Sequence, residues 1–370
     1  MTLTLHPAKL QGEIAAMPSK SDLHRLMIGA WLAGQDITTL PIISDDIAAT
    51  RDCLLANCTL NCRESGSTLR FLLPLMAALG RTVTFTGEGR LPERPLEPLL
   101  SLLRANGVTI QGDTLPLTIS GQLQPGRFEL PGNVSSQYIT GLLFALPLLP
   151  GNSEIILTSP LESAGYVEMT VRTLNKFCVF VEPSQIGWFV HDWSLYKPAT
   201  SLAPEGDWSN AAFWLAAGVN VVDLDKNSAQ PDRKIVQLLQ NLGDMDAAQC
   251  PDLVPIMAVV YALRPGEHRI YNAARLRIKE SDRLAAMAQN LKALGAEIEE
   301  QPDGLKIHGS KTLRGGTVDS FGDHRIAMAM AIAALYCDTS VTLHGAEAVA
   351  KSYPHFWADY QRLGGEVHGL

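Results

Sequence analysis

The stretch from Arg275 to Ile298 reads RLRIKESDRLAAMAQNLKALGAEI and places a charged loop, a helix and a strand in direct succession. Apolar residues recur at helical spacing from Leu284 to Leu294, which predicts an amphipathic helix that begins at about Asp282 and ends before Gly295. The cations of the loop therefore lie at the helix N-terminus, where the helix dipole is already positive. A solvated charged turn is one interpretation, and a site that binds an anion is the other.

Length and composition describe an ordinary globular protein with room for two domains. The chain has 370 residues, of which 46% are hydrophobic and 18% charged. Residues 1–12 lack the pattern of a signal peptide, and the longest apolar run, about Ile139 to Leu149, is too short to span a membrane. Six cysteines without a Cys-x-x-Cys pair are typical of a reducing compartment, so we expect a cytoplasmic protein with no membrane association. A zinc site at Cys53, Cys58 and Cys62 is disfavoured.

The distribution of charge argues for a small ligand. The net charge of -8 disfavours nucleic-acid binding, which needs a basic face. Several basic residues nevertheless gather in short polar segments: Lys20, Arg25, Arg70, Arg94, Arg275, Arg277, Lys279, Arg283, Arg325 and Lys351. An acidic chain with concentrated cations suits a small anionic ligand.

A repeated ending of helices organises the chain. Helical patterns close on a single Gly or Cys and continue into an alternating, strand-like tail at Cys58, Gly107, Cys178, Gly243, Gly295 and Gly364. Glycine is expected at this place because the residue after a helix often adopts the left-handed conformation.

Between these endings a second kind of helix begins, each with a polar head and an apolar body. The heads are Ser19–Ser21, Ser65–Ser67, Ser135–Gln137, Asp207–Ser209, Pro251–Asp252 and Gly322–Arg325. The bodies, such as Leu69 to Leu79, are apolar nearly all round and should be buried. Heads of Ser, Gly or Asp leave backbone N–H groups available to an anion, although each alone is also an ordinary N-cap. Six such units predict two domains of three units, with a boundary near Glu205.

Seven motifs, in order, resemble those of the 5-enolpyruvylshikimate-3-phosphate (EPSP) synthase family. They are Pro18–Arg25, Glu64–Arg70, Leu91–Pro95, Ser135–Gln137, Arg275–Arg283, Gly322–Arg325 and Lys351–Pro354. The resemblance implies a two-domain inverse α/β barrel of six repeated βα units, whose helix N-termini converge on an interdomain cleft. It also implies an N-terminal domain over residues 19–205, and a C-terminal domain built from residues 1–18 and 206–370.

The resemblance implies transfer of the carboxyvinyl group of phosphoenolpyruvate to the 5-hydroxyl of shikimate 3-phosphate, with release of phosphate. Both substrates carry phosphate and carboxylate, which require Arg and Lys partners. Proton transfer requires two carboxylates in different environments. The family likeness further implies a monomer that needs no metal and no organic cofactor, and that glyphosate inhibits in competition with phosphoenolpyruvate.

The resemblance assigns roles to particular residues. Asp252, Glu280 and Lys20 would be catalytic. Those that would bind shikimate 3-phosphate are Lys20, Ser21, Arg25, Ser135, Ser136, Gln137, Ser163, Asp252 and Lys279, with Tyr166 beside them. Those that would bind phosphoenolpyruvate are Lys20, Gly66, Arg94, Gln137, Arg283, Arg325 and Lys351. His324 would act through its neighbours, and Arg275 is a further candidate ligand.

The chain also departs from the family and leaves alternatives open. It is several dozen residues short, with losses near Leu60–Arg63 and Asp244–Cys250, which affect the completeness of two units rather than a motif. The sister enzyme that uses UDP-N-acetylglucosamine usually has Lys-Asn at Lys20-Ser21 and a reactive Cys on a loop, and 91–95 has none. A catalytically silent anion-binding protein would keep the scaffold and lose an acid or base, and an RNA-end-processing relative would need a basic face.

Overall fold

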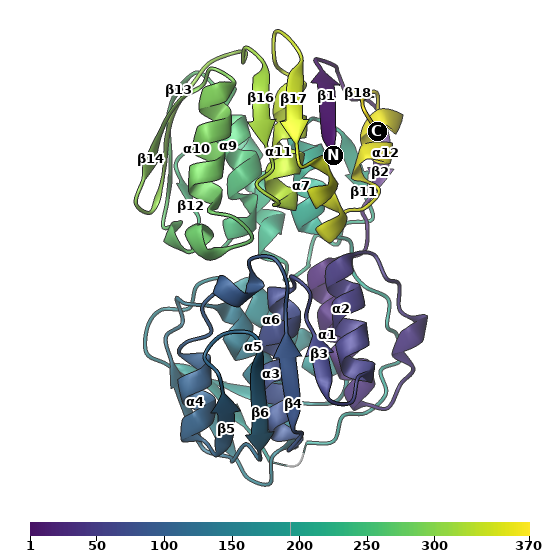
Figure 1. Cartoon of the computed structure of the whole chain (residues 1–370), viewed down its shortest axis with the longest axis vertical. Coiled ribbons are helices and arrows are strands. Elements are labelled where there is room, and N and C mark those ends of the chain that lie inside the picture. Colours follow the sequence, from purple (N-terminus) through teal and green to yellow (C-terminus); the bar gives the residue numbers. More distant parts are fainter. Residues whose placement is uncertain (193) are drawn as a thin grey trace. The chain divides into compact units, whose positions relative to one another are not determined.

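The computed structural model describes residues 1–192 and 194–370, which form two compact units. The N unit is Ser19–Pro204, and the C unit combines Met1–Pro18 with Glu205–Leu370. Each unit has its own hydrophobic core and mixes helices with strands, so each is an α/β domain (Figure 1).

The N unit contains two four-stranded sheets with the orders β3-β4-β6-β5 and β7-β8-β10-β9. Its strands are β3 (Thr59–Asn61), β4 (Val83–Thr86), β5 (Val108–Gln111), β6 (Leu117–Gly121), β7 (Arg127–Leu130), β8 (Ser153–Leu157), β9 (Val181–Ser184) and β10 (Gly187–Val190). Its α-helices are α1 (Lys20–Leu32), α2 (Asp45–Leu55), α3 (Gly66–Ala78), α4 (Leu99–Ala105), α5 (Ser136–Ala145) and α6 (Ala164–Lys176). In each sheet the first pair of strands is parallel and the following pairs are antiparallel.

The C unit repeats this order in two sheets, β12-β13-β15-β14 and β16-β17-β1-β18, and adds the parallel pair β2 and β11. Its strands are β1 (Thr2–His6), β2 (Glu13–Ala15), β11 (Asn220–Val222), β12 (Met245–Asp246), β13 (Gly266–Tyr271), β14 (Glu297–Gln301), β15 (Gly304–Gly309), β16 (Gly316–Asp319), β17 (Val341–His344) and β18 (Glu366–His368). Its α-helices are α7 (Trp208–Ala216), α8 (Ile235–Gln240), α9 (Val254–Ala262), α10 (Arg283–Ala293), α11 (His324–Ala334) and α12 (Phe356–Arg362). β1 lies between β17 and β18, which draws the start of the chain into this unit.

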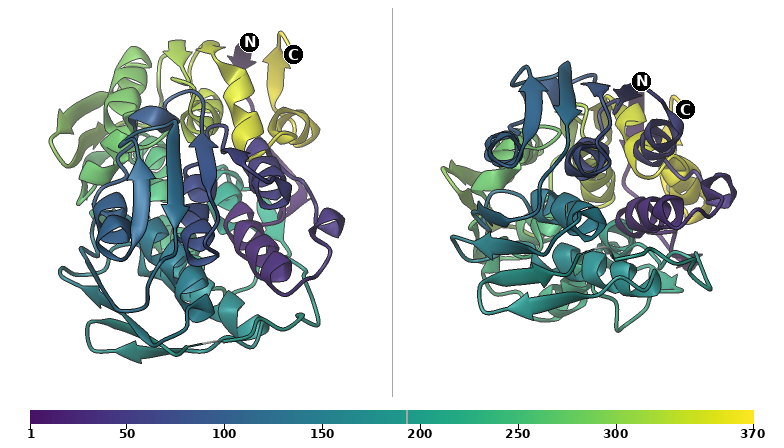
Figure 2. Two further views of the ribbon diagram at one scale, coloured as in Figure 1. Left: turned by 60° about the horizontal axis from the view of Figure 1, so that its bottom comes forward. Right: turned by 90° about the horizontal axis from the view of Figure 1, so that it is seen from below.

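The apolar helices lie inside their units, as their composition predicts. Nearly every residue of α3, and all of α11, is buried. Strands such as β4 bury alternate residues, so one face of the sheet packs on these helices. The further views in Figure 2 show the helices within each unit beside the sheets that cover them. The core of each unit therefore holds a helix that is buried along nearly all of its length.

The polar heads cap these helices. Ser19, Ser65, Ser135, Asp207 and Asp323 each precede a helix and accept a hydrogen bond from a backbone N–H of its first turn. The sixth head differs, because a 3-10 turn at Pro251–Leu253 precedes α9. Asp252 lies within that turn, and its carboxylate binds arginines instead. α10 begins after its cap Asp282 and ends before Gly295, as predicted.

Four of the six predicted helix endings adopt the left-handed conformation. Gly107, Cys178, Gly295 and Gly364 have φ angles of 92°, 60°, 85° and 103°. Cys58 and Gly243 do not. The strands that follow these four endings, β5, β9, β14 and β18, are antiparallel to their neighbours. By contrast, β3 and β12, which follow Cys58 and Gly243, each pair with a single parallel strand. The two exceptions thus coincide with the two places where the sequence analysis expects residues to be missing.

Candidate active site

Lys20, the first residue of α1, stands at the head of the N unit's basic cluster. Its ammonium lies 2.7 Å from Asp46 Oδ2, a carboxylate in the first turn of α2. Both side chains are about 15% exposed, so the pair is shielded but reachable. Ser19 is the N-cap of α1, so Lys20 lies in the first turn, where the backbone N–H groups point toward the N-terminal end of the helix.

Arg25, one turn further along α1, is buried and held by uncharged oxygens. Its guanidinium donates to Ser21 O at 2.6 Å, to Tyr166 O at 2.8 Å and to Thr170 Oγ1 at 2.9 Å. Burial lowers the pKa of Arg25 to about 10, which still leaves it protonated at neutral pH. The cation therefore lacks a carboxylate ligand among these bonds and retains its attraction for a bound anion.

Gly66, at the start of α3, is closely covered by two guanidinium groups. A Cβ added to Gly66 would lie 2.8 Å from Nη1 of both Arg70 and Arg94. Arg70 donates to Gln137 Oε1 at 2.8 Å, and Gln137 donates in turn to Ser67 Oγ at 2.9 Å. The heads of α3 and α5 therefore meet around these arginines, and the absence of a side chain at 66 lets both guanidinium groups lie close to the backbone.

The remaining candidates of the N unit lie at the starts of α5 and α6. Ser135 accepts from Gln137 N, and Ser136 opens α5. Ser163 precedes α6, is 2% exposed and has φ at 56°, a left-handed conformation that is uncommon for a side chain of this type. Tyr166 supplies the carbonyl that Arg25 binds. Hydroxyl and amide groups thus surround the cations on this side.

Arg283, the first residue of α10, is the centre of the C unit's cluster. Its side chain is 1% exposed and binds three carboxylates: Asp323 at 2.7 Å, Asp252 at 2.8 Å and Glu280 at 2.9 Å. Burial opposes ionisation of Arg283, but these carboxylates raise its pKa above the usual range. Asp323 is wholly buried, caps α11 and also accepts from Ser281 Oγ, so it fixes Arg283 in place.

Asp252 is shared by two arginines. Oδ1 accepts from Arg283 at 2.8 Å and Oδ2 accepts from Arg325 at 3.0 Å. Burial favours the neutral acid, but the charges of Arg325, Arg283 and Lys279 hold the pKa of Asp252 well below its usual value. Asp252 is therefore an ionised carboxylate whose two oxygens are both engaged.

Other candidates of the C unit have clear positions. Lys351 donates to Gly322 O at 2.8 Å, beside the start of α11. His324 is 2% exposed, and its Nδ1 lies 3.8 Å from Asp323 Oδ1. This position suits a residue that acts through Asp323. Arg275 donates to Ala248 O at 2.8 Å, a contact with the backbone.

The residues of the charged run Arg275–Arg283 have different sets of contacts, and Arg277 belongs to the set outside the Asp252 cluster. It binds Asp282 at 2.9 Å, Glu300 at 2.7 Å and two carbonyls of the β14–β15 turn. These contacts attach the loop before α10 to the sheet. Arg277 thus supports the loop, whereas Glu280 and Arg283 of the same run join the cluster around Asp252.

Three acidic residues of these clusters were not predicted as site residues. Asp46 pairs with Lys20 and Asp323 with Arg283. Asp232 is wholly buried, accepts from Ser209 Oγ and has its pKa raised to about 6 by burial and by the charge of Asp252. Asp323 is the N-cap directly before His324 and Arg325, so an N-cap next to a binding candidate is the signal that could have found it. Asp46 lies 26 positions from Lys20, so no local pattern marks it.

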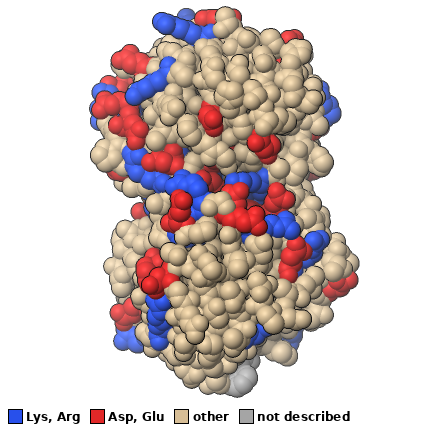
Figure 3. Space-filling view, in the orientation of Figure 1, with Lys and Arg blue, Asp and Glu red and all other residues tan. Residues whose placement is uncertain are grey.

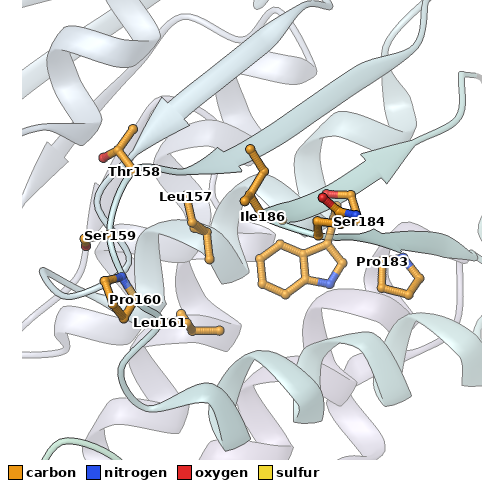
Figure 4. Close-up of a pocket in the computed structure, with 11 residues that line it drawn as sticks. Leu157, Thr158, Ser159, Pro160, Leu161, Pro183, Ser184 and Ile186 are labelled. Atoms are coloured by element: carbon orange, nitrogen blue, oxygen red, sulfur yellow. The ribbon is translucent and has the colours of Figure 1, made fainter.

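A cavity of about 460 Å³ lies elsewhere in the N unit, between the end of β8 and the β9–β10 turn (Figure 4). Leu157, Leu161, Ile186 and Trp188 line it together with small polar and proline residues. None of its lining residues is charged, so this cavity is chemically unlike the two clusters. On the face in Figure 3, basic side chains lie next to acidic ones in several places.

Membrane-spanning helices and metal clusters are two features that the described residues lack. Within residues 1–192 and 194–370, no helix combines the length and hydropathy that a membrane crossing requires. The part of the chain that the structure describes also holds no group of three or more His, Cys, Asp or Glu side chains arranged to bind a metal ion.

Each of the two α/β units holds buried arginines, the side chains that proteins use to bind phosphate and carboxylate groups. A family model described as EPSP synthase (3-phosphoshikimate 1-carboxyvinyltransferase) matches residues 52–245 and 222–360. The 3-phosphoshikimate 1-carboxyvinyltransferase of Clostridium acetobutylicum is 43% identical over 98% of this chain and 97% of its own length. That of Clostridium novyi is 41% identical over the same shares. The chain therefore belongs to the EPSP synthase family, a family of transferases.

A solved structure agrees on the fold. The EPSP synthase of Acinetobacter baumannii superposes with a TM-score of 0.80 over 100% of both chains, at 23% identity. The alignment with the Clostridium acetobutylicum relative runs over 419 positions, more than the 370 residues of this chain. The relative therefore has several dozen residues that this chain lacks, as the sequence predicted.

Proposed function

We propose that this chain transfers the carboxyvinyl group of phosphoenolpyruvate to the 5-hydroxyl of shikimate 3-phosphate and releases phosphate. Its family membership and the names of its relatives support the reaction. The observation that carries the assignment of residues is the buried cluster in which Arg283 binds Asp252, Glu280 and Asp323. Two carboxylates held in different surroundings by one arginine suit a reaction with two proton transfers.

The chemistry is an addition followed by an elimination. In the addition, the 5-hydroxyl oxygen bonds to C2 of phosphoenolpyruvate, its proton passes to Asp252, and C3 gains a proton to become a methyl group. In the elimination, C3 loses a proton, the C2–C3 double bond forms again, and the C2–O bond to phosphate breaks. The proton taken from the hydroxyl leaves with phosphate, so atoms and charges balance.

Asp252 must become more basic before it can accept the hydroxyl proton. Its two oxygens accept from Arg283 and Arg325, whose charges keep its pKa low. A phosphoenolpyruvate anion competes for Arg325, and loss of that hydrogen bond would raise the pKa of Asp252. Binding of the donor would thus activate the base that serves the acceptor.

Glu280 is the group we assign to C3. Its carboxylate is 20% exposed and is fixed by Arg283 at 2.9 Å, on the same guanidinium group that binds Asp252. Lys20 is assigned to the departing phosphate, because its ammonium can neutralise the charge that develops on the leaving oxygen. Asp46 holds Lys20 in the meantime.

The N unit supplies most ligands of shikimate 3-phosphate. We assign Lys20, Ser21, Arg25, Ser135, Ser136, Gln137 and Ser163 to the acceptor, together with Asp252 and Lys279 of the C unit. We assign Lys20, Gly66, Arg94, Gln137, Arg283, Arg325 and Lys351 to phosphoenolpyruvate. The arginines and serines among them match the phosphate and carboxylate groups of both substrates.

We also propose the finer organisation that the family likeness implies. Each unit would contain three βα repeats of an inverse barrel, two of them complete sheets and one reduced to fewer strands. A monomer carries every residue assigned above, and its six free cysteines suit the reducing cytoplasm. Size-exclusion chromatography tests the monomer.

The experiment that tests the function is release of inorganic phosphate that requires both substrates together. Glu280→Gln is expected to lower turnover by a factor of roughly a hundred or more, because the acid for C3 is lost, while shikimate 3-phosphate binding changes only slightly. Glu300→Gln is the matched control, since Glu300 binds Arg277 on β14 outside the cluster. No release with both substrates would refute the function, and full turnover of Glu280→Gln would refute its role.

A further inference from the structure

A buried chain of hydrogen bonds connects three helices of the N unit beneath Lys20 and Gly66. His24 Nδ1 on α1 lies 2.8 Å from Thr50 Oγ1 on α2, and Thr50 Oγ1 lies 2.7 Å from Thr68 Oγ1 on α3. The Thr68 hydroxyl donates at 2.7 Å to Ser65 Oγ, the N-cap of α3. All four side chains are no more than 1% exposed.

This relay ends at the turn that begins α3 and carries Gly66. Ser65 immediately precedes Gly66, so its position sets the first turn of α3. The hydroxyl oxygens of Thr50 and Thr68 also lie 3.4 Å from the backbone oxygen of Asp46, whose carboxylate holds Lys20 at 2.7 Å. His24 itself lies one helical turn from Lys20 on α1.

The direction of the relay follows from the number of protons available. Each hydroxyl carries one proton, and the Thr68 proton is used toward Ser65. Thr50 must then donate to Thr68, and His24 must donate from Nδ1 to Thr50. His24 Nε2 is buried and has no hydrogen-bond partner among the described residues, as suits the unprotonated nitrogen.

The imidazole adds no charge to a cluster that is already cationic. Burial, followed by the charges of Lys20 and Arg25, holds the pKa of His24 well below its usual value. The edge of the Phe71 ring packs against His24 at a centroid distance of 6.1 Å, which fixes the ring plane. A rigid donor in this place can set the rotamer of Thr50 without competing for the anion.

We propose that His24, through Thr50 and Thr68, is a positioning residue that fixes the Ser65–Gly66 turn, and thereby holds the Gly66 backbone in place for phosphoenolpyruvate. The inference rests on the proposed function, because that function assigns Gly66 to the donor alone. Arg25 and Ser163, assigned to the acceptor, do not contact the relay through any hydrogen bond described above. The relay should therefore affect the donor more than the acceptor.

Thr50→Val tests the relay, because valine keeps the shape of threonine and removes its hydroxyl. The KM for phosphoenolpyruvate should rise roughly tenfold, as expected when a buried donor loses its partner, with a smaller change in kcat and in the KM for shikimate 3-phosphate. Thr50→Ser restores the hydroxyl and should return the KM to within about twofold of the unaltered protein. Equal donor KM values for the valine and unaltered proteins, or equal rises for donor and acceptor, would overturn the proposal.

A second pair of variants guards against a folding defect at position 50. His24→Asn can donate from its amide near the place of Nδ1 and should keep the donor KM, whereas His24→Leu should raise it as Thr50→Val does. The ¹⁵N spectrum of the labelled histidine reports the relay without any turnover. The unaltered protein should show the Nδ1–H tautomer, and an Nε2–H tautomer or a protonated ring at neutral pH would overturn the relay. If the unaltered protein turns over neither substrate, the proposed function fails, and this spectrum alone then decides whether the hydrogen bonds exist.

Discussion

The two units treat their buried arginines in opposite ways. In the N unit, Arg25 donates to two carbonyls and to two threonine hydroxyls. In the C unit, Arg283 binds three carboxylates, and Arg325 shares one of them. Cations with neutral partners keep their charge for a ligand, whereas cations inside a carboxylate network control the ionisation of that network.

This difference suggests a division of labour within one reaction. The N unit has hydroxyls, an amide and guanidinium groups that bind neutral oxygens, which suit recognition of phosphate and carboxylate. The C unit has Asp252 and Glu280 fixed by a shared arginine, which suits proton transfer. Both sets of groups lie at the starts of buried helices, so the same local architecture is used with different side chains.

The largest expected effect separates these roles by kinetics. Asp252→Asn should lower kcat by a factor of roughly a hundred to ten thousand, because the amide cannot accept the hydroxyl proton. Arg94→Gln in the N unit should act mainly on the KM for phosphoenolpyruvate. Steady-state kinetics with both substrates varied distinguishes them, and a kcat loss of equal size in both variants would remove the distinction between the units.

A second effect concerns stability without substrates. Arg283→Met leaves three carboxylates without this cation and should destabilise the protein by about 3–5 kcal/mol. Arg25→Met leaves only neutral acceptors and should cost about 1–3 kcal/mol. Urea unfolding, monitored by hydrogen exchange in α10 and α1, measures both losses of stability. Arg269→Met is the control, since the exposed Arg269–Glu267 pair contributes little to stability. Equal losses for Arg283→Met and Arg25→Met would contradict the comparison.

Much of this organisation could be predicted from local patterns. Five of the six polar heads are N-caps with a side-chain hydrogen bond, because Ser and Asp satisfy the N–H groups at a helix start. The bodies of α3 and α11 are buried, because a helix that is apolar all round has no face for water. Helix α10 has the predicted bounds for the same reasons.

What could not be predicted depends on contacts between distant segments. Asp46 and Lys20 are 26 positions apart, and only the packing of α1 against α2 brings them together. Arg277 and Arg283 look alike in the charged run, but tertiary contacts send one to β14 and the other to Asp252. The endings at Cys58 and Gly243 also differ from the other four, and the strands that follow them, β3 and β12, each pair with one parallel neighbour.

A third effect is the opposite response of the two units to pH. Asp232 in the C unit has a pKa of about 6, above its ordinary value of 3.8. Its effect on the free energy of unfolding is therefore most favourable below pH 3.8, and the protein loses stability as pH rises from there to about 6. His24 in the N unit has its pKa lowered from 6.5, so its contribution is complete above pH 6.5 and is lost as pH falls below that value. The Asp232 contribution amounts to roughly 3 kcal/mol at most.

Variants that remove each group isolate these trends. Relative to the unaltered protein, Asp232→Asn should gain in Tm as pH rises from 4 to about 6.5, and His24→Asn should gain as pH falls from 6.5 to about 5. Differential scanning calorimetry over this range measures the Tm differences, in which the common effects of other carboxylates cancel. Tm differences that stay constant with pH would show that neither group is perturbed as described.

The smallest effect is at Gly66, where the arginines of the N unit approach the backbone. An alanine Cβ would stand 2.8 Å from Nη1 of Arg70 and of Arg94, and because these are the ends of long side chains, the guanidinium groups would shift rather than the helix. Gly66→Ala should therefore raise the KM for phosphoenolpyruvate by less than about tenfold and weaken competition by glyphosate, with little loss of stability. Gly243→Ala is a matched control in the C unit, since no described atom lies within 4 Å of its added Cβ and its φ angle is not left-handed. A large loss of Tm in Gly66→Ala, with an unchanged donor KM, would mean that the arginines over Gly66 serve the fold and not the ligand, and the contrast between the units would then rest on Arg25 alone.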